Sequence, residues 1–193
     1  MNNIRERFDA SGYLEVWKVY DDGTKELHFS DHNVITSGMG VGLAYLFAGS
    51  GSDNILDYQI RWFQVGLDQG VLDPSTYVLA SALSSVDSYG TSADIITSLH
   101  NQIKNGNSAD TEAFAFIPYH HVHKVGANSV RYTLVLNKDS ANGLNGPIEE
   151  VGLFMNNPKG GTPLKSILVA YRTFTGVQKT SEFALIFKWS ISF

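Results

Sequence analysis

Three histidines lie close together in the sequence, and imidazole is a ligand that suits zinc, copper, iron and nickel. On an extended strand His121 and His123 share one face, whereas His120 points to the other, because side chains alternate between faces. A complete metal site needs a third or fourth ligand, and none stands at a characteristic spacing. We therefore expect no metal and no cofactor, and name His121 and His123 as the candidates for a metal if one binds.

The acidic residues do not form a pair suited to general acid–base chemistry. Glu149 and Glu150 are adjacent, so on a strand they point to opposite faces. Asp21 and Asp22 supply oxygen ligands of the kind that calcium takes, but no EF-hand loop surrounds them. The hydrolase, phosphate-loop and zinc-protease motifs are absent from the sequence. A Ser-His-Asp set gathered from distant positions stays open, because triads are defined by geometry; we expect no enzymatic activity.

Two further segments each have a functional and a structural interpretation. Residues 38–42 (GMGVG) share two glycines with a dinucleotide-binding loop, but the third glycine is misplaced and no βαβ pattern surrounds it. We interpret this segment as a tight turn from a strand into a helix. The aromatic run at residues 58–63 (YQIRWF), with Tyr119 and Tyr171, could form a sugar-binding platform. We favour a place in the core, where aromatic stripes are more often found.

The composition excludes several classes of function. The 193 residues include no cysteine, which excludes disulfides, thiolate nucleophiles and cysteine-bound zinc. The net charge of -5, without a basic cluster, argues against nucleic-acid binding. The longest apolar run, at residues 41–48, is too short to cross a bilayer, and the charged first residues do not form a signal peptide. We therefore expect synthesis in a cytoplasm and no membrane insertion.

Alternation of apolar and polar residues predicts an antiparallel β domain. From Phe183 to Phe193 every second residue is large and apolar, which is typical of a strand with one face on a core. The same alternation, from Val130 to Leu136, predicts a second core strand. The expected strands are 13–20, 25–29, 58–67, 112–125 (interrupted at Pro118), 129–137, 148–155, 167–174 and 180–193. About seven or eight strands at these spacings predict an all-β antiparallel sandwich of jelly-roll type.

The remaining segments complete the predicted domain organisation. Residues 1–11 form a polar N-terminal arm, and residues 12–193 form a single β-sandwich domain. One short helix is expected near residues 39–48, with Thr36 or Ser37 able to cap it. Residues of about 69–106 form a long irregular insertion, in which short helices at 74–83 and 92–103 are possible. So long a connection is uncommon in a compact domain unless it is functional or contacts a partner.

Short motifs are spread through the last third of the chain. They are EVGLF at residues 150–154, LVAYR at 168–172, Phe174, the pair Lys179-Thr180 and WSISF at 189–193. This pattern resembles a group of small virion proteins of tailed bacteriophages. The Asn-led segment before a glycine-containing helix and the strand at 58–67 is similar to that group as well. The chain departs from the group at Tyr171, where a plain Ala-Arg is typical, and in the insertion at 69–106.

The resemblance implies a non-enzymatic structural component of a tailed-phage virion, assembled in the host cytoplasm. Its place would be the tail, baseplate or neck, or the capsid surface as a decoration protein. The expected partners are copies of itself, with a trimer favoured by the resemblance, and other virion proteins. The candidate interface residues are Arg5, Arg7, Asp73, Tyr77 and Tyr89. The alternative is a receptor- or glycan-binding β-sandwich module of the adsorption apparatus.

Overall fold

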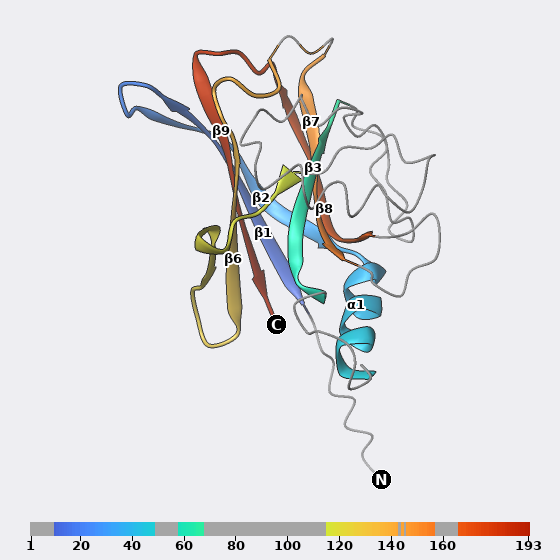
Figure 1. Cartoon of the computed structure of the whole chain (residues 1–193). Helices are drawn as coiled ribbons and strands as arrows, with labels where there is room; N and C mark the ends of the chain where they lie inside the picture. Colours follow the sequence, from blue (N-terminus) through green and yellow to red (C-terminus); the bar gives the residue numbers. More distant parts are fainter. Residues whose placement is uncertain (1–9, 49–57, 68–114, 143, 145, 157–165) are drawn as a thin grey trace.

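The fold is a single curled antiparallel sheet with one helix at its end (Figure 1). The computed structural model describes residues 10–48, 58–67, 115–142, 144, 146–156 and 166–193. Within these ranges nine strands are hydrogen-bonded in the order β4-β3-β7-β8-β2-β1-β9-β6-β5. The predicted all-β, sandwich-like fold is confirmed, whereas the jelly-roll type and the division into residues 1–11 and 12–193 stay predictions.

The elements follow the sequence pattern closely. The strands are β1 (Ser11–Tyr20), β2 (Lys25–Ile35), β3 (Ile60–Gly66), β4 (Ala115–Phe116), β5 (Val122–Lys124), β6 (Ser129–Leu136), β7 (Ile148–Asn156), β8 (Ser166–Val177) and β9 (Phe183–Ser192). The helix α1 (Ser37–Ala48) follows β2, and a 3₁₀ turn, η3 (Tyr119–His121), precedes β5. The predicted insertion at 69–106, with its two possible helices, lies outside the described residues.

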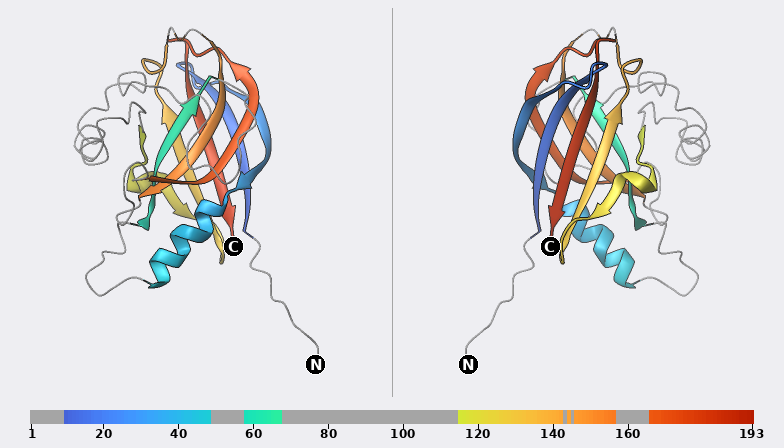
Figure 2. Two further views of the ribbon diagram at one scale, coloured as in Figure 1. Left: turned by 90° about the vertical axis from the view of Figure 1, so that its right-hand side faces the viewer. Right: turned by 90° about the vertical axis from the view of Figure 1, so that its left-hand side faces the viewer.

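The strand β2 divides the sheet into two layers. It pairs with β1 along almost its whole length but reaches β8 only through Val34 and Ile35. One layer therefore consists of β2, β1, β9, β6 and β5, and the other of β8, β7, β3 and β4. Figure 2 shows how the sheet curls so that the two layers face each other. The space between them is the core.

The two edges of the sheet are joined by the chain itself. The edge strands β4 and β5 are separated only by residues 117–121, so the free edges of β3 and β6 must lie near each other. Pro118 breaks the predicted strand at 112–125, because proline has no N–H to donate to a ladder. The structure therefore has two short edge strands, one on each side of the interruption that the sequence predicted at Pro118. Short edge strands also limit unwanted pairing with other chains.

The core is built on β9, whose residues alternate strictly between buried and half-buried. Phe183, Leu185, Phe187, Trp189 and Ile191 are buried as predicted. Their neighbours across the ladder are Leu14 and Val16 on β1 and Tyr132, Leu134 and Leu136 on β6, all of them buried. Phe187 packs against the opposite layer, with ring centroids 6.5 Å from Phe63 and 6.0 Å from Phe174. The predicted core residue Val130 is only partly buried.

A buried lysine connects the loop after β6 to the loop before β9. Lys179 is only 1% exposed. Its ammonium donates hydrogen bonds to the carbonyl of Lys138 (3.2 Å), the carbonyl of Thr180 (2.7 Å) and Oδ1 of Asn142 (3.1 Å). These three acceptors match the three protons of the ammonium. Burial lowers the pKa of Lys179 to about 8.

Candidate functional site

Of the site residues that were predicted from the sequence, two lie within the part of the chain that the structure describes. Arg5, Arg7, Asp73, Tyr77 and Tyr89 lie outside the described residues, so their predicted role at an interface stays a prediction. His121 and His123 are described, and both lie near the edge of the sheet beside β6.

The histidines do not occupy one continuous strand, in contrast to the prediction from their spacing. His121 ends the turn η3, whereas His123 lies on β5 and is exposed, because the turn after Pro118 interrupts the strand. The rings of His120 and His121 lie edge to face, with centroids 4.4 Å apart. Burial, followed by the nearby charge of His120, lowers the pKa of His121. In the part of the chain that the structure describes, no group of three or more His, Asp or Glu side chains could hold a metal ion.

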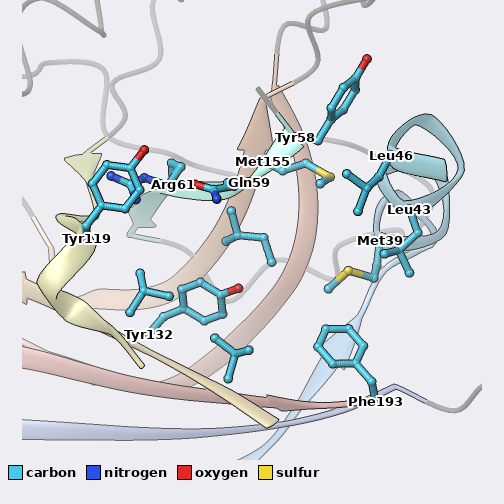
Figure 3. A pocket seen from close by; sticks show the side chains of 13 residues that line it. Met39, Leu43, Leu46, Tyr58, Gln59, Arg61, Tyr119, Tyr132, Met155 and Phe193 are labelled. Carbon is cyan, nitrogen blue, oxygen red and sulfur yellow. The ribbon is translucent and has the colours of Figure 1, made fainter. Parts of the chain in front are cut away.

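A pocket of about 370 Å³ lies at the end of the half-barrel where α1 and the end of β9 are found (Figure 3). Met39, Leu43 and Leu46 form one wall, since residues three and four apart lie on the same face of a helix. Strands β3, β6 and β7 supply other parts of the lining, including Tyr132 and Met155. The pocket therefore depends on elements far apart in the sequence, and no single motif marks it.

An irregularity in β3 brings a charged residue to this pocket. The pairing of β3 with β7 shifts register between Ile60 and Trp62, which leaves Arg61 as the extra residue of a bulge. Both Ile60 and Arg61 consequently line the pocket, although neighbours on a regular strand point to opposite faces. The carbonyl of Arg61 accepts a hydrogen bond from the N–H of Ile117 at 2.8 Å. That bond ties the bulge to the segment that joins the two sheet edges.

Burial affects the ionisation of two polar groups that line the pocket. Arg61 is only 5% exposed, and its guanidinium carbon lies 3.3 Å from the centroid of the Tyr119 ring. Burial lowers the pKa of Arg61, although an arginine keeps its charge at neutral pH. Burial also raises the pKa of Tyr132 to about 12, an effect that the charge of Arg61 partly opposes. Near neutral pH the lining of the pocket thus includes a cationic side chain and a neutral tyrosine hydroxyl.

Exposure distinguishes the rim of the pocket from its floor. Tyr119 is 63% exposed and Phe193 is 36% exposed, so both rings stand at the rim. Met39, Arg61 and Met155 are buried and belong to the floor. Solvent therefore reaches the pocket past two aromatic rings, and buried side chains form its floor.

The helix α1 presents a second feature on the same end of the molecule. None of its twelve residues is charged, and Phe47, near its C-terminal end, is 83% exposed. Its other face packs closely on β7 and β8: a Cβ at Gly38 would lie 2.2 Å from the carbonyl oxygen of Leu168, and one at Gly42 would lie 1.8 Å from the sulfur of Met155. The glycines at residues 38–42 therefore serve close packing after a turn from strand to helix.

The turn into α1 is fixed by hydrogen bonds to β8. The N–H of Thr36 donates to the carbonyl of Val169 at 3.0 Å, and the hydroxyl of Thr36 donates to the carbonyl of Leu168. The helix begins at Ser37, two residues before the predicted start. The threonine hydroxyl thus holds the helix on the sheet, where the sequence had suggested it as a cap for the helix.

The aromatic run at residues 58–63 is part of the interior, as favoured from the sequence. Tyr58, Trp62 and Phe63 are each at most 4% exposed, so they offer no platform to a sugar. Sequence reasoning missed Arg61 and Tyr132 as site residues. The available signal was an arginine inside a largely apolar segment, which the structure shows to be a strand buried at every position.

No family model, curated protein or solved structure matches the chain. No helix in the described ranges is long and apolar enough to cross a membrane.

Proposed function

We propose that the protein is a non-enzymatic structural subunit of a tailed-phage virion, which assembles with copies of itself and with other virion proteins. The observation that carries this proposal is the uncharged helix α1 with its exposed Phe47. A surface helix of a globular protein normally has a charged or polar face, whereas a helix that is apolar all round is normally buried. The outward face of α1 is therefore suited to burial against another protein chain.

The anchoring of α1 supports this role. Gly38 and Gly42 have no Cβ, so the helix can pack closely on β8 and β7. Hydrogen bonds from Thr36 to β8 hold the start of the helix in place. A rigid helix loses little conformational entropy when a partner covers it, which favours binding. Phe47 would supply the aromatic anchor that protein interfaces commonly contain.

The sequence supports the virion assignment separately. The motifs that resemble the phage group lie in β7, β8 and β9 and in the loop that contains Lys179, which are the elements that build the core. The resemblance thus concerns the residues that determine the fold. Only 17% of the residues are charged, against about 25% on average, as expected where subunits cover much of the surface.

The test is the assembly state of the Phe47→Asp variant. We expect the wild-type chain to form a closed homo-oligomer, with a trimer favoured, and the variant to dissociate because a carboxylate cannot be buried without a partner. Light scattering after size-exclusion chromatography over a dilution series gives the mass of each species.

Leu27→Asp is the matched control, since Leu27 is 46% exposed on β2, away from the helix. Leu27→Asp should keep the wild-type mass, and both variants should stay folded. A wild-type chain that is monomeric at every concentration, and that does not enter phage particles when they assemble, would contradict the proposed function.

A further inference from the structure

The pocket beside α1 has the size and the lining of a binding site for a small molecule. Its volume of about 370 Å³ lies within the range of ligand sites, roughly 300–1,000 Å³. Most of its lining residues are aliphatic, methionine or phenylalanine, namely Met39, Leu43, Leu46, Ile60, Val122, Val130, Met155 and Phe193. Such a lining removes an apolar ligand from water, which is the main source of affinity in sites of this kind.

The hydroxyl of Tyr132 is directed into this apolar pocket without a partner. Tyr132 is only 8% exposed, and Figure 3 shows that its hydroxyl points into the pocket. No hydrogen bond joins this hydroxyl to another residue in the part of the chain that the structure describes. A ligand that fills the pocket must therefore supply an acceptor for it, because a hydroxyl buried without a partner costs free energy.

The charges of the lining do not favour a charged ligand. No acidic side chain is among the described residues that line the pocket, so a cation would be buried without a partner. Arg61 is the one basic residue among them, but its guanidinium stacks on Tyr119 and the residue has a further interaction within the protein. An anion would lose its hydration without meeting a cation that is available to it. The pocket thus favours an uncharged ligand.

The side chains at the floor and at the rim favour an aromatic body. Met39 on α1 and Met155 on β7 are buried at the floor. Methionine side chains adapt to irregular shapes, and their sulfur atoms make favourable contacts with aromatic rings. At the rim, the rings of Tyr119 and Phe193 offer aromatic contacts as well. The lining therefore suits a ring that carries one acceptor atom.

We propose that this pocket binds an uncharged aromatic molecule with one carbonyl group, whose ring contacts α1 and β7 and whose carbonyl oxygen accepts a hydrogen bond from the hydroxyl of Tyr132. The hydroxyl can donate near neutral pH, since burial raises the pKa of Tyr132 to about 12. This binding is separate from the proposed role of the protein in assembly, which uses the outward face of α1.

NMR titration of the full chain with three small probes tests the selection of the ligand. Acetophenone and ethylbenzene share the ring and a two-carbon substituent and differ only in the carbonyl, whereas benzoate carries a negative charge on the same ring. Acetophenone and ethylbenzene are both expected to bind, and benzoate is expected to bind more weakly than acetophenone because its charge loses hydration. Failure of acetophenone or ethylbenzene to bind, or binding of benzoate at least as tight as that of acetophenone, would overturn the proposal.

Tyr132→Phe assigns the hydrogen bond to its donor. The variant should bind acetophenone roughly two- to tenfold more weakly than the wild type, which is the contribution of a hydrogen bond between neutral groups. It should bind ethylbenzene with wild-type affinity. Each ligand is compared between two proteins, so the difference in hydrophobicity between the ligands cancels. An equal change for both ligands, or no change for acetophenone, would contradict the assignment.

Tyr58→Phe is the matched control. Tyr58 lines the same pocket, and its hydroxyl is likewise buried without a hydrogen-bond partner among the described residues. Figure 3 shows that this hydroxyl is directed away from the other labelled side chains. Both ligands should therefore keep their wild-type affinity in Tyr58→Phe. A loss of acetophenone binding equal to that in Tyr132→Phe would show that the effect is not specific to Tyr132.

A further variant tests the place of binding without changing either tyrosine. Leu43→Trp fills the pocket from its partly buried helical wall. Acetophenone and ethylbenzene should both lose binding in this variant. Retention of either ligand at wild-type affinity would place the binding elsewhere and overturn the proposal.

Discussion

At the scale of single residues, Trp189 shows how strongly one side chain can determine the stability of this core. It is fully buried in the middle of β9, opposite Leu14 on one side and Tyr132 on the other. Trp189→Ala should lower the free energy of unfolding by about 3–5 kcal/mol, because a large cavity remains. Urea denaturation measures this change.

Trp189→Phe is the control for that prediction. It keeps most of the ring volume and removes an indole N–H that is buried without a hydrogen-bond partner. Its destabilisation should be clearly smaller than that of Trp189→Ala. Similar values for the two variants would mean that cavity formation is not the cause.

The buried ammonium of Lys179 predicts a pH dependence of stability. Its pKa is about 8 in the folded protein, below the ordinary value of 10.5. Between these two values the unfolded chain binds more protons than the folded chain, so the free energy of unfolding must rise with pH. Below pH 8 both states are protonated, and this contribution is flat.

Comparison with Lys179→Met isolates that effect. The difference in free energy of unfolding, wild type minus variant, should grow in favour of the wild type as the pH increases from 8 to 10. Tyr132 titrates in both proteins and cancels in the difference. Guanidinium denaturation at each pH gives the values, and a difference that stays constant would show that Lys179 has an unshifted pKa.

At the scale of elements, the glycines of α1 predict opposite effects of the same substitution. A Cβ at Gly38 would meet the backbone carbonyl of Leu168 at 2.2 Å, and backbone atoms cannot move aside cheaply. Gly38→Ala should therefore destabilise the protein by about 1–3 kcal/mol. At Gly40 nothing lies within 4 Å, so Gly40→Ala should stabilise by about 0.5–1 kcal/mol through helix propensity.

Thermal and urea unfolding of the two variants checks this pair. The two substitutions are chemically identical and only two residues apart in one helix, so each serves as the control for the other. Effects of the same sign and size would mean that α1 does not pack on β8 as closely as described.

The elements also show why sequence patterns predicted the strands better than the site. Strict alternation in β6 and β9 reports directly which face is buried, so their core residues were predictable. The bulge at Arg61 could not be predicted, because it depends on the register between β3 and β7, which are some ninety residues apart in the sequence. The pocket needs four or more such distant elements, and no local pattern encodes their meeting.

The histidines illustrate the same limit. Spacing alone placed His121 and His123 on one face, and Pro118 was recognised as a break, but the consequence for the residues after it depended on the turn η3. Local patterns define faces only within an uninterrupted element. Beyond a break, the tertiary structure determines the direction of each side chain.

At the scale of the whole molecule, the N-terminal residues offer a separate test of assembly. β1 begins at Ser11, which pairs with Ser192, so residues 1–9 can be removed without loss of a ladder bond in the described sheet. We expect this deletion to leave the thermal midpoint unchanged. We also expect weaker assembly, because an arm that carries Arg5 and Arg7 can contact a neighbouring subunit and add avidity to the main interface.

Two measurements report the effect of this deletion on assembly, separately from its effect on the fold. Light scattering over a dilution series should show dissociation at a higher concentration than for the wild type, and incorporation into assembling phage particles should fall. The double variant Arg5→Glu and Arg7→Glu should behave like the deletion, since opposite charges would then be presented to the neighbour. If the deletion assembles and incorporates as well as the wild type, the residues before Ala10 have no part in assembly, and the subunit contacts must come from α1 and the rest of the domain.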